Sequence, residues 1–555
     1  MVDKLKVLMC SEASFLSSGF GTYTKELLTR LYKTKKYKIA EFASYAFVND
    51  PRDVSIPWRY YANAVRENDP RHKEYSSRTD NQFGRWRFEK ILFDFKPDVV
   101  IDIRDYWMSY YQSISPLRNF FHWILMPTVD SEPQQEQWID TFISADAIFT
   151  YSDWGADVLL KQSNNKINYI DTVSPGVDLN IFNIKSNPEQ IKQNFGLPKD
   201  SIIIGSVMRN QKRKLIPELF FAFRELLDSL ERNNNDIGKK IYLYLHTSYP
   251  DAGWDIPELL KQTRLANRVF FTYTCPSCEH ILSSTFSHPF RTCPSCGTYG
   301  LRFPSVTHGI SQEALANIYN MFDLYVQYAI CEGFGMPQVE AAACGVPIIT
   351  VNYSAMCDIV KKLGAYSVEP KTYFKELETK AIRTYPDNKQ LINHILSHIQ
   401  LSKTEKQNKR QTTRALAEQY YNWDDIALKW EKYLDTLSDS GFRANWDNPP
   451  KYLELVQDIE NIQRKDFFNQ IVNTCVKNLQ DPSKIGSSMI LDMAKDADYS
   501  FTQAGISFQP FSYGDIHDNL QSLVNNNNQT ESLRTSNVKF NDDFIQYAHL
   551  KDKDE

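Results

Sequence analysis

The sequence predicts an α/β protein with two successive doubly wound parallel sheets, a small cysteine-rich insertion and a mainly helical C-terminal extension. Three observations predict this fold. Short apolar runs alternate with amphipathic helical segments, as in parallel sheets that are covered by helices. A segment with Pro175, Gly176 and Pro188 interrupts the alternation, which then begins again. The length of 555 residues is enough for three or four domains of ordinary size.

Residues 1–185 are expected to form the first domain. Its strands are short apolar runs, and its helices carry apolar residues at helical spacing. We expect strands at Lys6–Cys10, Asp98–Ile103, His122–Thr128 and Ala147–Tyr151, and helices at Thr22–Tyr32 and Gln135–Ser144. Residues 50–90 are polar, aromatic and irregular, which favours an insertion at the rim of a cleft.

Residues 186–413 are expected to form the second domain, which faces the first across a cleft. Its predicted strands are Ser201–Val207, Lys240–Leu245, Arg268–Thr272, Leu324–Tyr328 and Val346–Val351, and its helices are Ile216–Leu230 and Gln312–Met321. From Lys371 onward we expect mostly helix. Residues 414–438 form a long helix that includes Arg414–Leu434, and residues 440–555 form a helical extension with a flexible acidic tail.

The composition excludes several classes of protein. With 42% hydrophobic residues and a net charge of -5, the chain is neither disordered nor strongly basic. The sequence contains no run of 18 or more apolar residues, so we expect no transmembrane helix. The N-terminus does not resemble a signal peptide. Five of the nine cysteines are scattered, which suits a reducing compartment. We therefore expect a cytoplasmic protein, in the host cytoplasm if the chain is viral.

Four cysteines form two identical Cys-Pro-Ser-Cys segments, at Cys275–Cys278 and Cys293–Cys296, within residues 273–300. This spacing predicts a zinc ribbon in which Cys275, Cys278, Cys293 and Cys296 bind one structural Zn²⁺. Four unrelated thiols or a redox pair are the alternatives. His280 and His288 are expected to be bystanders, because four sulfurs complete the coordination. The ribbon follows a predicted strand, so we expect it beside the cleft.

The segment Cys331–Thr350 has the most chemical content. Gly333 and Gly335 lie in a strand-to-helix turn, and Pro337 suits the first turn of the helix. The N–H groups that begin such a helix favour a phosphate. Glu332 and Glu340 are placed to accept hydrogen bonds from sugar or ribose hydroxyls in the cleft. The alternative for either residue alone is an ordinary acidic side chain near a helix N-terminus.

Four segments in order resemble one family. Glu332-Gly-Phe-Gly-x-Pro-x-x-Glu340 is similar to the E-x7-E motif of the retaining glycosyltransferases of family 4, which have the GT-B fold of two facing Rossmann-like domains. The family's N-terminal glycine loop, its interdomain signature and its basic donor-phosphate segment resemble Ser18–Leu27, Ser174–Phe182 and Gly205–Lys214. The resemblance covers roughly residues 1–435.

The resemblance implies a hexosyl- or pentosyltransferase that moves a sugar from a nucleotide-diphosphate sugar to an acceptor hydroxyl with retention of configuration. The donor would be bound by Gly19 and Gly21 next to the diphosphate, by Arg209 and Lys214 as its counter-charges, by Glu340 at the ribose, and by Glu332 with the amides of Phe334, Gly335 and Met336 at the transferred sugar. In that family the ribbon's loop lies near the donor base, so we expect the ribbon to contact the acceptor or cover the donor.

The acceptor side departs from the family pattern. The family often has a histidine after the strand that here reads His122–Thr128, whereas this chain offers Asp130 at the far end and His122 at the start. Asp130 is better placed at the carboxyl edge of a sheet, although an aspartate that caps the next turn is an alternative. Asp-x-Asp occurs only at Asp496–Asp498 and Asp552–Asp554, so we expect no catalytic metal.

The sequence leaves two classes of acceptor open. One is a nucleic acid, such as a modified viral DNA base, and the other is a glycan or a protein. The aromatic stretch Trp58–Trp86 and the zinc ribbon favour a nucleic acid, and the stretch contains five arginines, Arg59, Arg66, Arg71, Arg78 and Arg85. The acidic net charge favours the other acceptors. A catalytically inactive sugar-nucleotide-binding assembly module and a related epimerase are alternative functions, and the C-terminal extension is a candidate surface for oligomers.

Overall fold

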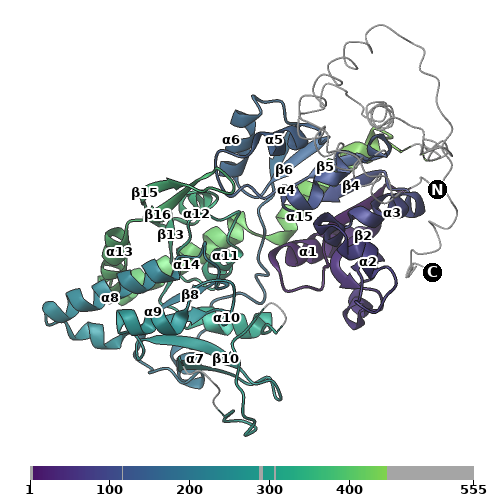
Figure 1. Cartoon of the computed structure of the whole chain (residues 1–555). Coiled ribbons are helices and arrows are strands. Elements are labelled where there is room, and N and C mark those ends of the chain that lie inside the picture. Colours follow the sequence, from purple (N-terminus) through teal and green to yellow (C-terminus); the bar gives the residue numbers. More distant parts are fainter. Residues whose placement is uncertain (1–3, 116, 287–291, 306–307, 445, 447–555) are drawn as a thin grey trace.

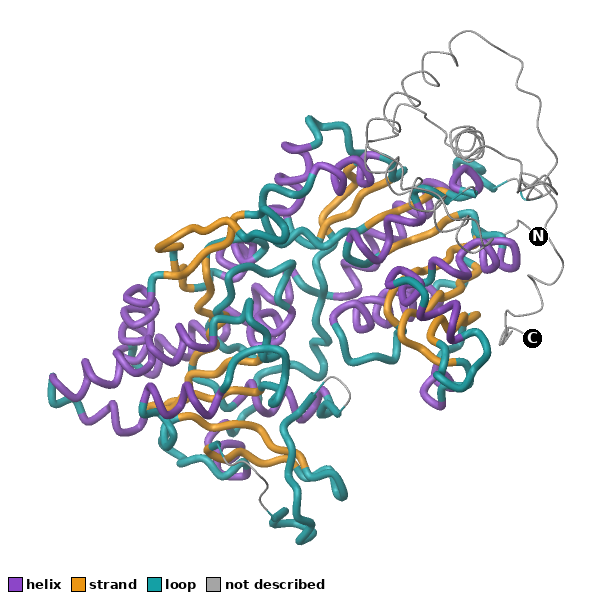
Figure 2. The backbone as a smooth tube through the Cα atoms, viewed as in Figure 1, coloured by secondary structure: helices purple, strands orange, loops and turns teal. Residues whose placement is uncertain are grey.

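Two seven-stranded sheets organise the computed structural model, which describes residues 4–115, 117–286, 292–305, 308–444 and 446 (Figure 1). The strand orders are β3-β2-β1-β4-β5-β6-β7 and β11-β10-β9-β8-β12-β13-β14. Every pairing within the two sheets is parallel except β10 with β11. Helices lie on the faces of both sheets (Figure 2). The predicted pair of doubly wound sheets is confirmed.

The N-terminal domain contains the first sheet. Its strands are β1 (Lys6–Glu12), β2 (Lys38–Phe47), β3 (Arg59–Ala64), β4 (Val99–Asp102), β5 (His122–Leu125), β6 (Ala147–Thr150) and β7 (Tyr169–Thr172). Its helices are α1 (Gly19–Lys33), α2 (His72–Ser76), α3 (Phe88–Phe95), α4 (Tyr106–Ser109), α5 (Glu136–Ile143) and α6 (Asp153–Gln162). All elements expected in this domain are present. The sequence did not indicate three of its strands and four of its helices, namely β2, β3, β7, α2, α3, α4 and α6.

Residues 50–90 are not wholly an insertion. Strand β3 (Arg59–Ala64) pairs with β2 and forms one edge of the first sheet. Trp58 and Tyr61 are buried in the cores of this domain. Trp58 and Tyr61 therefore belong to the cores around this sheet, whereas the helical turn Pro51–Ser55 and the short helices after β3 lie outside it.

The C-terminal domain contains the second sheet. Its strands are β8 (Ile202–Val207), β9 (Ile241–His246), β10 (Val269–Thr274), β11 (Ile281–Thr285), β12 (Leu324–Gln327), β13 (Ile348–Val351) and β14 (Tyr366–Val368). Its helices are α7 (Pro188–Asn194), α8 (Ile216–Arg232), α9 (Ile256–Thr263), α10 (Gln312–Asn320), α11 (Met336–Ala343), α12 (Met356–Leu363) and α13 (Asn388–Gln400). A hairpin of β15 (Pro370–Lys375) and β16 (Ile382–Pro386) replaces the helix expected after Lys371, since its Thr, Tyr and Phe residues favour strands.

The predicted long helix at residues 414–438 is two helices. Helix α14 (Lys403–Tyr420) packs on α11 and α12 of the C-terminal domain, whereas α15 (Trp423–Asp439) packs on α1 of the N-terminal domain. In Figure 1, α15 is the green helix beside α1 and α4. The break occurs because the Asn422 side chain caps α15, accepting a hydrogen bond of 2.9 Å from the Asp424 N–H. Nearly all of residues 440–555 lie outside the described residues.

The chain crosses between the domains twice, and the two crossings touch. The Val177 N–H donates to the Tyr421 carbonyl over 2.9 Å. A Cβ at Gly176 would be 2.8 Å from Cγ of Trp423, so only glycine fits there. The Trp430 indole N–H donates to the Tyr23 hydroxyl (2.9 Å), which donates to the Val173 carbonyl (2.8 Å). The expected interdomain segment is therefore fastened to α15 and α1.

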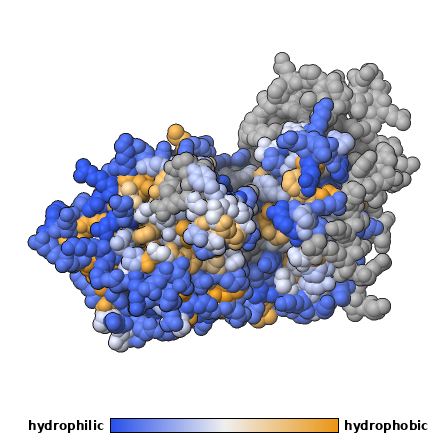
Figure 3. Space-filling view, turned by 90° about the horizontal axis from the view of Figure 1, so that it is seen from below, coloured by the Kyte–Doolittle hydropathy of each residue, from blue (hydrophilic) through white to orange (hydrophobic). Residues whose placement is uncertain are grey.

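The surface in Figure 3 is mostly hydrophilic, with apolar residues in scattered small areas. Among the described helices, none is both long enough and apolar enough to cross a bilayer.

Replacing Gly176 with alanine tests this crossing. Because the added Cβ overlaps Trp423, we expect Gly176→Ala to lower the free energy of unfolding by about 1–3 kcal/mol. Urea denaturation followed by tryptophan fluorescence measures the change. Gly309→Ala is the matched control, since the nearest atom to its added Cβ is 3.8 Å away. Equal stability of the two variants would contradict the close approach.

Candidate active site

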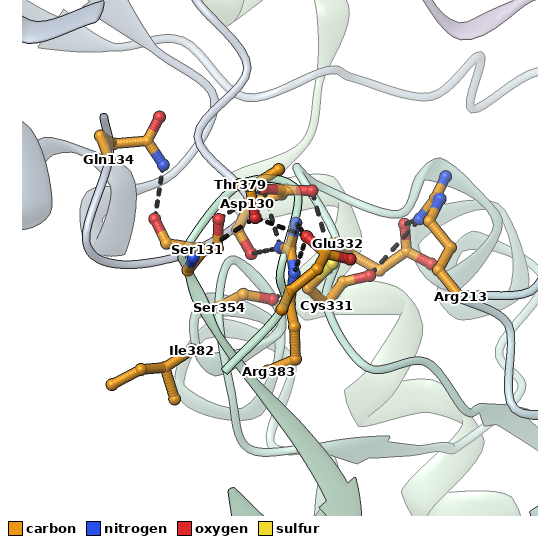
Figure 4. Close-up of polar contacts among 12 residues, drawn as sticks. Asp130, Ser131, Gln134, Arg213, Cys331, Glu332, Ser354, Thr379, Ile382 and Arg383 are labelled. Carbon is orange, nitrogen blue, oxygen red and sulfur yellow. Dashed lines mark hydrogen bonds and ion pairs between the residues drawn. The ribbon is translucent and has the colours of Figure 1, made fainter. Parts of the chain in front are cut away.

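Glu332 is the centre of the candidate site. It lies in the loop between β12 and α11, where Gly335 adopts a φ of 90° that lets the chain turn into the helix. The Glu332 residue is 3% exposed, and its N–H donates to the Ser354 hydroxyl over 2.9 Å. Figure 4 shows Arg213 approaching its carboxylate from one side and the Asp130–Arg383 contact on the other. A buried carboxylate here requires cationic partners.

Two cations and an amide surround the Glu332 carboxylate. Arg213 Nη1 lies 2.7 Å from Oε2, Lys214 Nζ contacts Oε1, and Gln327 Nε2 donates to Oε1 over 2.7 Å. Burial opposes ionisation of Glu332, but Arg213 and Lys214 outweigh it and lower its pKa to about 2. Burial lowers the pKa of Lys214 to about 8, a shift that Glu332 limits. The group therefore holds two cations and one anion near neutral pH.

The fold of the basic segment explains this arrangement. The Ile330 N–H donates to the Arg213 carbonyl (3.0 Å) and the Leu215 N–H to the Tyr328 carbonyl (3.2 Å), so the segment lies against the loop after β12. Lys214, expected from the sequence, is in the site. Arg213 was not singled out. It lies next to Lys214 in the same basic segment and has the same partner, so the run of basic residues is the signal that could have found it.

Arg209 lies apart from Glu332. Its guanidinium makes a bidentate pair with the Asp251 carboxylate, with distances of 2.8 and 3.0 Å. The Arg209 side chain is 49% exposed, and its partner holds it at the end of β8. Arg209 is therefore an accessible cation at the carboxyl edge of the second sheet.

Glu340 lies in the second turn of α11, which begins at Met336. It is half-buried, and its Oε2 accepts a hydrogen bond of 2.7 Å from the Tyr319 hydroxyl. Burial raises the pKa of Glu340 to about 7, and the Tyr319 hydroxyl limits the rise. The residue therefore changes its protonation near neutral pH. Phe334, from the same loop, packs against Tyr421 with ring centroids 5.7 Å apart.

The two predicted glycines at the start of α1 differ in role. A Cβ at Gly19 would be 3.9 Å from Sδ of Met336, so the first turns of α1 and α11 approach each other across the domains. A Cβ at Gly21 would be 2.6 Å from the Leu16 carbonyl oxygen, and the Gly21 N–H donates to Oγ of Ser18 over 3.1 Å. The structure thus gives Gly21 a packing role within its own loop.

Asp130 joins the two domains beside Glu332. Its Oδ1 lies 3.0 Å from Arg383 Nη1 and accepts a hydrogen bond of 2.8 Å from the Ser131 hydroxyl. The Cys331 thiol donates to its other oxygen over 3.4 Å. The Ile382 N–H also donates to the Glu132 carbonyl over 2.8 Å. The β15–β16 hairpin is therefore fastened to the loop that follows β5 (Figure 4).

His122 and Asp105 are the other candidate residues of the N-terminal domain. His122 lies away from Glu332, because its Nε2 is 2.9 Å from the Tyr433 hydroxyl on α15 and its ring packs on Phe442. Asp105, after β4, was missed. Burial and the charge of Asp130 raise its pKa to about 6, with Arg213 opposing the rise. Since it follows a parallel strand, the rule that selected Asp130 also selects Asp105.

The arginines of residues 58–86 have internal partners. Four of them pair with carboxylates within this domain, at N–O distances of 2.6–3.0 Å, in Arg59–Asp94, Arg71–Asp69, Arg78–Asp80 and Arg85–Asp80. The Trp58 indole is buried and donates to Glu41 over 2.8 Å. This stretch is therefore largely neutralised, and its first tryptophan is not available for stacking on bases.

The four predicted zinc ligands come together. All four sulfurs lie within 4.8 Å of one another, with Cys275–Cys296 and Cys278–Cys293 separations of 3.5 and 3.7 Å. Sulfurs bound tetrahedrally to zinc at about 2.3 Å are about 3.8 Å apart, so the cluster fits this ion. His280 does not belong to the cluster, and His288 lies outside the described residues.

Comparisons with known proteins point to one class. Residues 305–396 match the family model for glycosyl transferases group 1. The chain is 26% identical over 205 residues to the D-inositol 3-phosphate glycosyltransferase of Mycolicibacterium smegmatis, and 23% identical over 221 residues to that of Thermobifida fusca. These matches cover 37% and 39% of this chain, and only 37% and 42% of the relatives' own lengths.

Solved structures show the same fold. Sucrose-phosphate synthase from Thermosynechococcus elongatus is 18% identical with a TM-score of 0.57, and the similarity covers 79% of this chain and 100% of that one. Anabaena HepE in complex with UDP and glucose is 13% identical with a TM-score of 0.52, covering 78% of this chain and 100% of that one. At these identities the likeness establishes the fold, which is GT-B.

A double-mutant cycle tests the Asp130–Arg383 contact. Arg383 is 5% exposed, so we expect Asp130→Asn and Arg383→Gln to be coupled by about 0.5–3 kcal/mol in the free energy of unfolding, as measured in urea. The exposed interdomain pair Arg30–Asp424 is the control, with an expected coupling below about 1 kcal/mol. Additive effects of the two substitutions would contradict a direct contact.

Proposed function

We propose that this chain is a retaining glycosyltransferase of family 4, which transfers a hexosyl or pentosyl group from a nucleotide-diphosphate sugar to an acceptor hydroxyl. The observation that carries the proposal is the Glu332 carboxylate, buried between Arg213 and Lys214 in the loop that leads into α11. The first residue of α11, Met336, approaches Gly19 of α1. The match of residues 305–396 to glycosyl transferases group 1 supports it. HepE, which has the same fold, binds UDP and glucose.

The donor diphosphate would bind where positive charge gathers. Arg213 and Lys214 exceed the charge of Glu332 by one unit. Arg209 is balanced by Asp251 but is 49% exposed, so its guanidinium could still donate hydrogen bonds to the diphosphate. The N–H groups at the start of α11 add the positive end of a helix dipole. When the sugar leaves, charge develops on the diphosphate, so these groups act mainly in the transition state. They supply the positive charge that a catalytic metal would otherwise supply.

The carboxylates would orient the hydroxyl groups. Glu340 would accept hydrogen bonds from the donor ribose, and Glu332, with the amides of Phe334, Gly335 and Met336, would hold the transferred sugar. Asp130, and next to it Asp105, would hold the acceptor at the edge of the N-terminal sheet. Retention would follow from attack on the face that the leaving phosphate vacates, with that phosphate accepting the acceptor proton.

We propose a glycan or a small polyol as the acceptor. The internal ion pairs of Arg59, Arg71, Arg78 and Arg85 leave little free charge for a phosphate backbone. The curated relatives are named for D-inositol 3-phosphate, a polyol that carries one phosphate group. We also propose a reducing, cytoplasmic location, because none of the eight cysteines in the described residues forms a disulfide.

Donor turnover tests the enzyme against an inactive binding module. The protein is screened by thermal shift over UDP- and GDP-sugars, and release of the nucleoside diphosphate is then measured with the best donor. Since Lys214 would stabilise the leaving group, we expect Lys214→Met to lower kcat by about 100-fold or more. Lys212→Met, an exposed cation of the same segment, is the control. Unchanged turnover in Lys214→Met, or no donor binding across the panel, would contradict the proposal.

The pH dependence of donor binding follows from two groups. Glu340 becomes a carboxylate as the pH rises through about 7, so affinity should rise there. Lys214 loses its charge above about 8, so affinity should then fall. Isothermal titration calorimetry should therefore give a maximum between these values. Glu340→Gln should abolish the rise and keep the fall. A rise that persists in Glu340→Gln would show that another group causes it.

A further inference from the structure

The two cysteine turns have the same backbone conformation. In each, the N–H of the first cysteine donates to the carbonyl five residues later, from Cys275 to His280 (2.9 Å) and from Cys293 to Thr298 (2.8 Å). In each, the residue four positions after that cysteine has a positive φ, 57° at Glu279 and 74° at Gly297. Two turns with the same backbone bond, whose four sulfurs all lie within 4.8 Å of one another, form a built metal site.

The site lies at the base of an aromatic cluster. Strand β10 leads into the first turn, and the chain leaves the second turn to pair again with β10 through reciprocal backbone bonds between Thr274 and Arg302, of 2.8 and 3.0 Å. The next residue, Phe303, packs on Tyr273 (4.7 Å between centroids), Phe271 and Phe286 (both 5.7 Å). The segment between Thr274 and Arg302 contains both cysteine turns, and its ends are paired. The position of Phe303 therefore depends on the conformation of this segment.

The same cluster holds the loop at residues 248–254. Tyr249 packs on Phe286 and Phe303, with centroids 5.5 and 5.9 Å apart. Two residues later, Asp251 makes the bidentate pair with Arg209. The aromatic cluster thus connects the cysteine site to a cation of the candidate active site.

The loop also binds the rest of the basic segment. The Trp254 indole N–H donates to the Lys214 carbonyl (2.7 Å), and the Trp254 backbone N–H donates to Oδ1 of Asn210 (2.8 Å). Gly253 lies so close that a Cβ there would be 2.5 Å from the Asn210 carbonyl oxygen. Residues 248–254 therefore contact the basic segment at Arg209, Asn210 and Lys214.

We propose that Cys275, Cys278, Cys293 and Cys296 bind one Zn²⁺ ion, and that this ion positions Arg209 and Lys214 through Phe303, Tyr249 and the loop at residues 248–254. Four thiolates leave no open coordination position, so the ion acts on structure and not on substrate. Zinc binding by the four cysteines does not depend on the proposed function. The effect of the ion on donor binding does rest on the proposed function.

Metal content tests the site directly. The full chain, purified without added metal and measured by inductively coupled plasma mass spectrometry, should contain about one zinc per chain. The double variant Cys278→Ser/Cys296→Ser changes the two exposed cysteines and should lose the ion. Cys357→Ser, a thiol outside the cluster, should keep it. Iron in place of zinc, no metal, or zinc retained in the double variant would overturn the assignment.

Hydrogen exchange tests the connection without any donor. Removing zinc from the full chain with a chelator should speed amide exchange in residues 248–254 by about tenfold or more, and should leave β1 unchanged. Re-adding zinc should restore protection. Unchanged exchange in the loop after zinc is lost would refute the positioning role, and faster exchange in β1 as well would show general unfolding and refute it too.

The Phe303→Leu variant tests whether zinc acts on residues 248–254 through the aromatic cluster. This variant leaves all four cysteines in place but weakens the contact with Tyr249, so it should keep zinc and still speed exchange in residues 248–254. Its affinity for the donor found by thermal shift should fall about tenfold. Protection equal to that of the unchanged protein would overturn the proposed route. Faster exchange with no change in donor affinity would leave the route intact and count against the proposed donor site.

Discussion

The ionised Glu332 carboxylate, buried between Arg213 and Lys214, is the interaction on which the site depends. A buried carboxylate without cations would be strongly destabilising, so the basic segment must fold against the loop after β12. That loop then places Cys331 on Asp130, and it places Gly333 where a Cβ would be 2.4 Å from Cγ2 of Thr128. One ion cluster thus fixes both the conformation of the candidate site and a contact between the domains.

The sequence predicted what local patterns determine. The apolar runs that became β1, β8 and β12 are continuous and bounded by turn residues, so their ends were placed within a few residues. Strand β3 and the β15–β16 hairpin were missed because polar and aromatic residues mix in them, and only their neighbours in the sheet decide their conformation. The break before α15 depends on a single capping side chain, Asn422.

The candidate site likewise contains residues that local motifs predict and partners that they do not predict. The glycine turn, Glu332, Lys214 and the four cysteines follow from short motifs, because backbone geometry and ligand spacing are local properties. The partners of these residues are not local: Arg209 binds Asp251, Asp130 binds Arg383, and Glu332 binds Arg213. Each of these pairs joins segments that only the tertiary fold brings together, so no spacing in the sequence reveals it. Asp105 is the exception, since its place after a parallel strand was visible.

The return of α15 to the first domain has a consequence for how the protein is made. Trp430 stacks on Phe149 with centroids 4.3 Å apart, and Trp446 donates to the Pro97 carbonyl over 2.9 Å. The ribosome therefore synthesises the first sheet early, but its core is complete only after the whole second domain has emerged. At about 5–20 residues per second, that interval is on the order of ten seconds or more, during which an apolar face stays uncovered. The domain that is synthesised first is therefore the domain whose core is completed last.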